Sequence, residues 1–498
     1  MSRSKSSARE IWTGFRPYII TAAAIVAAYV LFALLLNFGQ AAVRGLMLGG
    51  LGLCGLWLLW RTLSKKCASK TEALIAALIA AGIVMRVGYM LYTSFMARGH
   101  DIGGTDGTGH YAYMYQIFAN GTLPQTNEYQ FYHPPLTHIL QAAVVKVFSW
   151  FRPNAEMNSL FEAAKLVPCF ASAATLIVTR SLCRAMEVKP RATALAVAVV
   201  AFQPTFYIFS SSVNNDSLMV LFYMAAVLYT IRWYSAPTMK NILMIALAIG
   251  LGMMTKLSAA SVAFFTGPVF LAVFIKFFKE GRAGRIFGQF AAFLGVCAPL
   301  GLWYPVRNYI KFGQQFGHVF TISSTSELYC GDKSFVSRFL SFPPDQILTP
   351  LYCQPYGDYH LWIYTLKCSI FGEFSFNWPD AFAALLIAAN LILILVSIAA
   401  MIYVIIRGKE VNAFARYGLF WLWLIQMVSF VVFNIRFPFG CTMDFRYIVP
   451  TVIVGAIYIG IALDRIKAKN KAVANGIFCI GVAAVALFGL ASVLFYAA

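Results

Sequence analysis

The sequence predicts an all-α polytopic membrane protein with about thirteen transmembrane helices. Of its 498 residues, 60% are hydrophobic and only 12% are charged, and the mean hydropathy is +0.72. These values exclude an ordinary soluble globular protein. Apolar runs of about 20 residues, the length that crosses a bilayer as a helix, recur along the chain. Since lipid offers no partner to backbone polar groups, each run is expected to be helical.

Basic residues are distributed asymmetrically between the predicted loops. The N-terminal tail and six loops hold 25 of the 39 lysines and arginines but only 6 of the 19 acidic residues, counting Glu72 with its adjoining loop: 1–16, 61–70, 180–191, 232–240, 276–285, 407–416 and 464–471. The positive-inside rule places these segments in the cytoplasm. The net charge of +20 therefore indicates topology, and we expect no nucleic-acid partner.

The predicted elements divide the chain into four parts. Residues 1–71 form a basic tail without a cleavable signal peptide and two extra helices, at about 18–37 and 44–60. Residues 72–305 form a transmembrane module that includes the first large outer loop, 95–164. A second outer loop at 306–380 precedes the closing helices of 381–498. With no retention or targeting signal evident, we expect a multi-pass protein of the bacterial plasma membrane.

Two features of the outer loops need interpretation. Leu136–Phe151 begins at Pro-Pro, and its polar residues fall on one arc of the helix, which favours a helix lying in the membrane interface. Cys330 and Cys353 share the second outer loop, and spacing leaves both a disulfide and two free thiols open.

The first outer loop concentrates ionisable residues in a chain that has few. It holds four of the six histidines together with Asp101 and Asp106. A carboxylate just beyond a span can act as a general base toward a hydroxyl group, although glycine and aspartate also suit plain turns. Arg86, inside the span that leads to this loop, is expected to face a polar interior and a partner.

Further polar residues stand at the outer ends of later spans. Lys256, Arg307 and Arg446 can each pair with a phosphate or act as snorkelling anchors. Asp216, in Asn214-Asn215-Asp216, opens a span, where it serves either as part of a helix cap or as a ligand of a polar group.

In this order the motifs resemble the C-type (GT-C) membrane glycosyltransferases that use polyprenyl-phosphate sugars, such as the protein O-mannosyltransferases and the lipid A aminoarabinose transferase. The resemblance rests on Arg86, Asp106 with Asp101, His133-Pro134-Pro135-Leu136, Thr255-Lys256, Tyr304-Pro305-Val306-Arg307-Asn308 and Arg446-Tyr447. It covers about residues 72–465. The chain departs from the family pattern at Asp106-Gly107, where the family often has Asp-Glu, and at His133, where it usually has lysine.

The resemblance implies transfer of a hexosyl or pentosyl group, with inversion, from a polyprenyl-phosphate donor to an acceptor hydroxyl on the extracytoplasmic side. The acceptor is a protein, a lipid or a cell-wall glycan. Asp106 or Asp101 would be the base. The donor phosphate would contact Arg86, Lys256, Arg307, Arg446 and His133, and the substrates would contact His110, Tyr111, Tyr132, Asp216 and Trp303. No cofactor is implied; a divalent cation in the acidic, histidine-rich loop is left open, because no ligand spacing requires one.

Two other functions remain to be weighed. A secondary transporter or lipid flippase would place ionisable groups near the bilayer midplane and break helices in matching halves, whereas here the charges gather at the outer end. A non-catalytic scaffold would explain the spans but not the polar loop.

Overall fold

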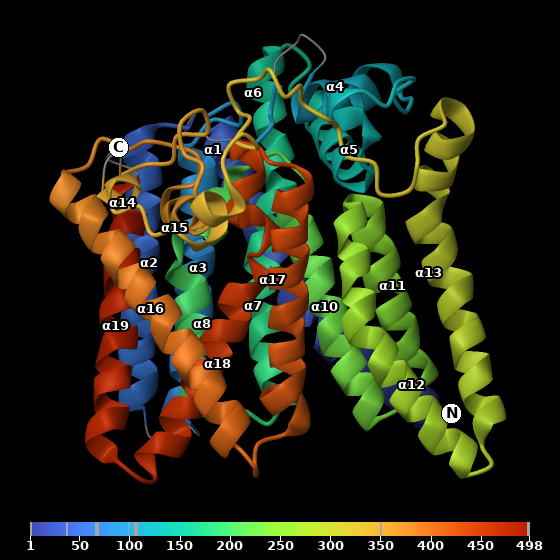
Figure 1. Ribbon diagram of the computed structural model, residues 1–498, viewed down its shortest axis with the longest axis vertical. Helices are drawn as coiled ribbons and strands as arrows, with labels where there is room; N and C mark the ends of the chain where they lie inside the picture. Colours follow the sequence, from blue (N-terminus) through green and yellow to red (C-terminus); the bar gives the residue numbers. More distant parts are fainter. Residues whose placement is uncertain are drawn as a thin grey trace.

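The computed structural model describes residues 2–35, 38–64, 69–97, 99–103, 108–348 and 351–495, and side chains from residue 14 onward except those of residues 345 and 348. Over these ranges the chain forms a bundle of long helices with loops and short helices gathered at one end (Figure 1). The bundle helices are α1 Ser2–Leu34, α2 Gln40–Leu63, α3 Lys70–Tyr92, α7 Leu166–Ala185, α8 Pro190–Phe202, α9 Pro204–Ser211, α10 Asp216–Ser235, α11 Met239–Thr255, α12 Ala263–Lys279, α13 Ala283–Phe312, α16 Asp380–Arg407, α17 Leu419–Arg436, α18 Pro450–Lys467 and α19 Lys471–Leu494.

The predicted fold class is confirmed. Within the described ranges, ten helical segments are long and apolar enough to cross a membrane, and α8 with α9 adds a span bent by 48°. Two more of the predicted passes correspond to α11, a shorter apolar helix, and to α18, whose last turn carries Arg465 and Lys467. The count of thirteen stays a prediction.

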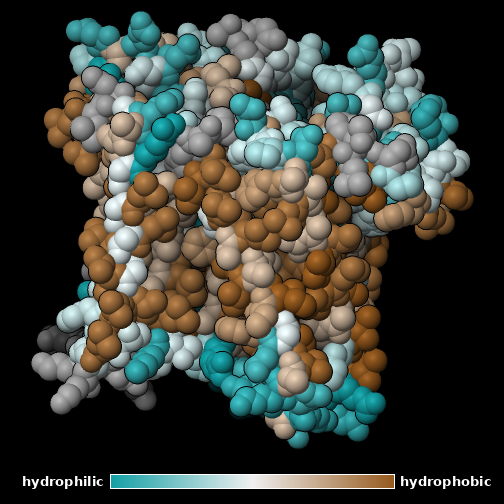
Figure 2. Space-filling view, turned by 90° about the vertical axis from the view of Figure 1, so that its left-hand side faces the viewer, coloured by the Kyte–Doolittle hydropathy of each residue, from teal (hydrophilic) through white to brown (hydrophobic). Residues whose placement is uncertain are grey.

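The molecular surface agrees with a membrane location. On the face that Figure 2 shows, hydrophobic residues cover the middle of the bundle between hydrophilic ends. Large apolar side chains are exposed on the bundle helices, among them Leu59 on α2, Phe264 on α12, Leu294 on α13 and Leu395 on α16. An extensive exposed apolar surface is stable only against lipid or another apolar surface.

The two ends of the bundle differ in the length of their connections. One end, called the loop end here, carries the long connections 93–165 and 313–379 with α4 His110–Asn120, α5 Leu136–Phe151, α6 Met157–Phe161, α14 Asp345–Leu348 and α15 Leu361–Phe371 (Figure 1). All six histidines lie in these two connections. The other end carries short turns within the basic loops that the sequence assigns to the cytoplasm. That the loop end faces away from the cytoplasm stays a prediction.

Helix α5 lies among the loop-end helices and packs against α4 and α7. The expectation that its polar arc is the water-facing side is wrong for two residues. His138 and Gln141 are fully buried, because the arc turns toward α4, where His110 Nδ1 lies 2.9 Å from His138 Nε2. Lys146, farther along the same arc, is exposed.

The second outer loop contains no Cys330–Cys353 disulfide. Both thiols are free and buried, and they lie against different segments. Cys330 donates its backbone N–H to Pro438, whereas the Cys353 thiol donates to the carbonyl oxygen of Tyr364 at 3.4 Å.

Arg86 stabilises the break between α8 and α9. Its guanidinium donates to the carbonyl oxygens of Val200 at 2.8 Å and Ala201 at 3.0 Å, close to the end of α8, and to Gly82 at 2.9 Å within α3. Its Nε donates to Ser172 at 2.9 Å. The side chain is fully buried, and its donors are directed at backbone oxygens that the bend leaves without helical partners. Arg86 therefore joins three helices, and the structure does not bring it to the charged residues of the loop end.

We expect Arg86→Lys to lower the free energy of unfolding by about 2–4 kcal/mol. A lysine keeps the charge but cannot replace the fork of donors, so buried carbonyl groups lose their partners. Thermal unfolding of the detergent-solubilised protein measures the effect, with the exposed Arg285→Lys as the control. An Arg86→Lys variant as stable as the control would contradict this structural role.

Candidate functional site

Five segments that are distant in sequence meet at the loop end and bring together seven ionisable side chains. We call this group the charged cluster: His100, Asp101, Asp216, Lys256, Glu373, Asp444 and Arg446. They come from the connection after α3, the first turn of α10, the junction after α11, the connection after α15, and the short helix η7 Phe445–Tyr447 with the residue before it. Each segment begins or ends a helix at the same end of the bundle, which explains why they meet.

Arg446 lies at the centre of the cluster. Its guanidinium is 2.8 Å from a carboxylate oxygen of Asp101 and 3.9 Å from one of Asp216, and its side chain is only 4% exposed. Asp216 also pairs with Lys256 at 2.5 Å. Both cations also lie near one aromatic ring, with Lys256 Nζ and Arg446 Cζ at 5.0 Å and 5.1 Å from the ring centre of Tyr447. The ion pairs thus run from Asp101 through Arg446 and Asp216 to Lys256, with charges of alternating sign.

Asp101 is held in a strained backbone conformation at the edge of this group. Its φ is +52°, in the left-handed region that few residues other than glycine adopt. Its carbonyl oxygen accepts from the N–H of His110 at 2.9 Å, which docks the start of α4 on the loop. Gly109 makes this docking sterically feasible, because a Cβ there would lie 2.1 Å from the carbonyl oxygen of Ile102. The Asp101 side chain is 39% exposed, so the strain keeps a carboxylate at the mouth of the cluster.

The pKa of Asp101 is lowered to about 2. Burial acts to raise it, but the positive charge of Arg446, the largest opposing influence, and the hydrogen bond from its guanidinium outweigh that effect. Burial likewise raises the pKa of Asp444, against the opposing charges of His100 and Arg446. Asp101 therefore stays ionised throughout the neutral range.

A group of histidines lies next to the cluster. His110 bonds to His138 through their ring nitrogens and stacks on His133, with ring centres 5.9 Å apart. Tyr132 packs on His133 with centres 4.0 Å apart. Burial lowers the pKa of His110 to about 4 and holds that of His133 well below its ordinary range. These imidazoles are neutral at pH 7 and can donate or accept hydrogen bonds without adding charge.

The residues predicted on α13 support the loop rather than join the cluster. Arg307 donates to the carbonyl oxygen of Pro124 at 2.6 Å and to Asn308 at 2.7 Å. Trp303 packs edge-on against Tyr304, with ring centres 5.4 Å apart. The hydroxyl group of Tyr304 in turn bonds to that of Tyr113 at 2.8 Å. These contacts fix α4 and the following loop to the end of α13.

Of the predicted site residues, the structure brings Asp101, Asp216, Lys256 and Arg446 into the cluster, and places His110, His133 and Tyr132 beside it. It leaves Arg86, Arg307 and Trp303 elsewhere, and Tyr111 packs among the rings of Phe95 and Phe161, with centres 5.5 and 5.1 Å away. Asp106 lies outside the described residues.

Three members of the cluster were absent from the predicted site. His100 directly precedes Asp101, and Asp444 lies two residues before Arg446. Their closeness in sequence to these predicted residues could have placed both in the site. Glu373, which follows α15, carries no such signal, since only the fold brings the second long connection onto the first.

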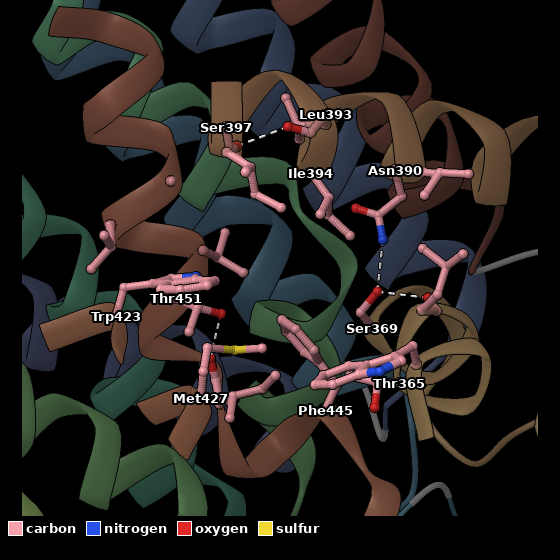
Figure 3. Close-up of a pocket in the computed structure, with 18 of the residues that line it drawn as sticks. Thr365, Ser369, Asn390, Leu393, Ile394, Ser397, Trp423, Met427, Phe445 and Thr451 are labelled. Carbon is pink, nitrogen blue, oxygen red and sulfur yellow. Dashed lines mark hydrogen bonds between the residues drawn. The ribbon is translucent and has the colours of Figure 1, made fainter. Parts of the chain in front are cut away.

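A largely apolar cavity of about 500 Å³ lies between helices α8, α15, α16, α17 and α18. Figure 3 shows Ile394, Ser397, Trp423 and Met427 directed into it. Polar groups in its wall bond to one another, as where the amide of Asn390 donates to the hydroxyl oxygen of Ser369 at 2.7 Å. The ring of Phe445, the residue before Arg446, also lines it, so the cavity and the cluster meet at consecutive residues.

Residues 125–312 match the family model described as dolichyl-phosphate-mannose-protein mannosyltransferase. This range includes His133, Asp216, Lys256 and Arg307. The resemblance to membrane glycosyltransferases that use polyprenyl-phosphate sugars is confirmed by this match.

The chain is also similar in fold to two solved membrane proteins. The archaeal oligosaccharyltransferase AglB from Archaeoglobus fulgidus, in complex with an inhibitory peptide and a dolichol-phosphate, is 14% identical over 85% of this chain and 56% of that chain, with a TM-score of 0.48. ArnT from Cupriavidus metallidurans, bound to undecaprenyl phosphate, is 15% identical over 84% of this chain and 77% of that chain, with a TM-score of 0.35. The chain thus spans little more than half the length of AglB. No curated protein matches the chain in sequence.

The buried neutral histidines predict an acid-sensitive fold. Between the ordinary histidine pKa of 6.5 and the lowered value of about 4 for His110, the unfolded chain binds a proton that the folded chain does not. The free energy of unfolding therefore falls as the pH falls through this window. Thermal unfolding at about pH 7 and pH 5 measures the loss, and His110→Gln is expected to reduce it. An equal loss in the variant would contradict the assignment.

Proposed function

We propose that this protein is an integral-membrane glycosyltransferase that moves a hexosyl or pentosyl group from a polyprenyl-phosphate donor to an acceptor hydroxyl. One observation carries the proposal: the carboxylate of Asp101 lies against Arg446, beside Asp216 and Lys256. Lys256 and Asp216 belong to the range that matches the mannosyltransferase family. A base beside cations is the arrangement that a hydroxyl nucleophile and a phosphate leaving group require.

The reaction is an in-line displacement with inversion at the anomeric carbon. The acceptor oxygen forms the new bond to that carbon, an aspartate takes the hydroxyl proton, and the old bond breaks so that its electron pair leaves with the polyprenyl phosphate. Arg446 and Lys256 stabilise the charge on the phosphate. Either Asp101 or Asp106 is the base.

The ion pair with Arg446 makes the base strength of Asp101 depend on whether the donor is bound. A carboxylate with a pKa of about 2 is a weak base while the guanidinium is bound to it. A phosphate group that pairs with Arg446 competes with Asp101 for the same donors. Donor binding would thus raise the pKa of Asp101 and make it a stronger base only when the sugar is present.

We place the prenyl chain of the donor in the apolar cavity. Its wall includes α16 and α17, which are long and apolar enough to cross a membrane, and Phe445 in that wall precedes Arg446. A lipid phosphate bound to Arg446 can extend its hydrocarbon along Phe445 into the cavity.

The charge asymmetry of the loops supports an extracytoplasmic site in a cell membrane. The turns opposite the loop end belong to the basic segments that the positive-inside rule assigns to the cytoplasm. The acceptor then reaches the site from outside as a hydroxyl group of a protein, a lipid or a cell-wall glycan.

A transporter or flippase is less well supported. The bent span α8–α9 is the kind of broken helix that transporters use for binding. Its charged neighbour Arg86, however, already donates to the carbonyl oxygens of Gly82, Val200 and Ala201, so the break is filled by the protein itself.

We expect the variants Asp101→Asn and Asp106→Asn to identify which aspartate acts as the base. Loss of the base lowers kcat by about 10²–10⁴-fold. The measurement is consumption of lipid-phosphate sugars by the purified protein, with a panel of sugars tested on the wild type first. Asp332→Asn, an exposed loop aspartate, serves as the control and should keep full activity.

If both variants turn over like the control, the aspartate mechanism is wrong. If the wild type consumes none of the donors, the proposed function itself is wrong.

The cavity is tested by Ile394→Trp, with Leu395→Trp as the matched control. Ile394 lines the cavity, whereas Leu395, the next residue of α16, is 57% exposed on the lipid-facing surface. The bulky side chain in the cavity should raise the KM for a long-chain donor about 10-fold or more and change kcat little. Equal KM values for the two variants would place the prenyl chain elsewhere.

A further inference from the structure

We propose that His100, Glu373 and Asp444 form a binding site for one divalent cation of the Mn²⁺ or Zn²⁺ class. The three residues belong to the charged cluster, and the site adds an ion to the function proposed above. The effect of the ion on the donor rests on that function, whereas the existence of the site does not.

The spacing of the three side chains suits a common metal ion. One ligand atom from each residue lies within 4.8 Å of the other two. His100 Nδ1 is 3.2 Å from Asp444 Oδ2 and 3.5 Å from Glu373 Oε2. Two ligands at right angles, each about 2.1 Å from one ion, are about 3 Å apart. Charge-assisted hydrogen bonds between such groups are shorter, at about 2.7–2.9 Å.

A buried carboxylate oxygen in this group, Asp444 Oδ2, faces His100 Nδ1 at 3.2 Å and Arg446 Nε at 3.7 Å but makes no hydrogen bond to either. Asp444 Oδ2 is inaccessible to solvent and makes no hydrogen bond within the described part of the chain, and the residue is 2% exposed. A buried charged acceptor without a hydrogen bond destabilises the fold even when positive groups lie nearby. A cation between this oxygen and His100 would supply the missing interaction.

The other atoms of the three ligands are already held in place. Glu373 Oε1 accepts from the hydroxyl group of Tyr364 at 2.8 Å, and Asp444 Oδ1 accepts from the backbone N–H of Arg446 at 2.8 Å. The His100 ring packs on Phe374, with centres 5.2 Å apart. Each carboxylate is thus fixed by one oxygen while the other is directed at the site, as outer-shell bonds do in metal centres.

The charge of the cluster also favours a cation. Four carboxylates, those of Asp101, Asp216, Glu373 and Asp444, surround two permanently charged cations, Lys256 and Arg446. These carboxylates and two cations sum to a net charge of −2. Burial acts to lower the pKa of His100, but the carboxylates of Asp444 and Glu373 raise it, as an excess of negative charge does. A bound divalent ion would offset that excess and add a further positive centre for a lipid phosphate.

The mixed donor set indicates which class of ion fits. Mg²⁺ and Ca²⁺ prefer oxygen ligands alone, and a site with an imidazole is typical of first-row transition ions or Zn²⁺. Two carboxylates and one imidazole leave further coordination positions for water or a phosphate oxygen.

The experiment is a titration of the full-length, detergent-solubilised and chelator-treated protein with Mn²⁺, following the electron paramagnetic resonance signal of the free ion. The wild type is expected to bind one equivalent, and Zn²⁺ is expected to displace it. His100→Gln and Glu373→Gln should each weaken binding at least about 10-fold. Asp332→Asn is the control and should bind like the wild type. Asp444 is not substituted, because it also caps Arg446.

Thermal unfolding with and without Mn²⁺ provides a second measurement. The ion should raise the unfolding temperature of the wild type and the control but not of the two ligand variants. Mn²⁺ binding in both variants equal to that of the control, or no binding by the wild type, would overturn the proposal. Both measurements are independent of sugar transfer, so failure of the ion site is distinguished from failure of the proposed function.

Discussion

The ion pair between Arg446 and Asp101 is the interaction on which the loop end depends. Arg446 is almost completely buried, and a buried guanidinium needs acceptors that compensate its desolvation, which carboxylates provide here. Asp101 can hold its strained backbone conformation because this pairing and the N–H of His110 fix it from two sides. One cation therefore fixes the connection after α3, the start of α10 and the segment before α18 in relation to one another.

The sequence predicted the membrane fold because hydropathy and loop charge are properties of whole segments. They do not depend on how individual side chains pack. It also predicted four members of the cluster, since Asp101, Asp216, Lys256 and Arg446 each stand where a span meets a loop. Glu373 was beyond prediction, because its place depends on how the second long connection folds over the first. The buried side of α5 was mispredicted for a related reason: polar residues on an amphipathic helix face water unless a partner such as His110 is available, and periodicity does not reveal partners.

Arg86 and Arg446 illustrate why a buried arginine in a membrane protein cannot be assigned a role from sequence alone. Both are shielded from solvent. The guanidinium of Arg86 bonds to carbonyl oxygens at a helix break, and these neutral acceptors leave its positive charge uncompensated but its donors satisfied. Arg446 bonds to carboxylates, which an anionic ligand can replace. The two arginines differ in the groups that accept their hydrogen bonds, and which groups these are is decided by the fold.

The position of Phe445 and Arg446 links the bilayer to the charged cluster. The two residues share the short helix η7, yet the ring of Phe445 lines the apolar cavity while the guanidinium of Arg446 lies among carboxylates. Backbone contacts hold this helix, because the N–H of Arg446 bonds to Asp444 and that of Phe445 to the sulfur of Cys368. A ligand with a hydrocarbon chain and a phosphate would engage both consecutive side chains, and a displacement at either one would move the other. A soluble phosphate would reach only Arg446. For the donor proposed above, a preference for a lipid phosphate over a soluble one would rest on having the apolar and the charged contact at consecutive residues of one short helix.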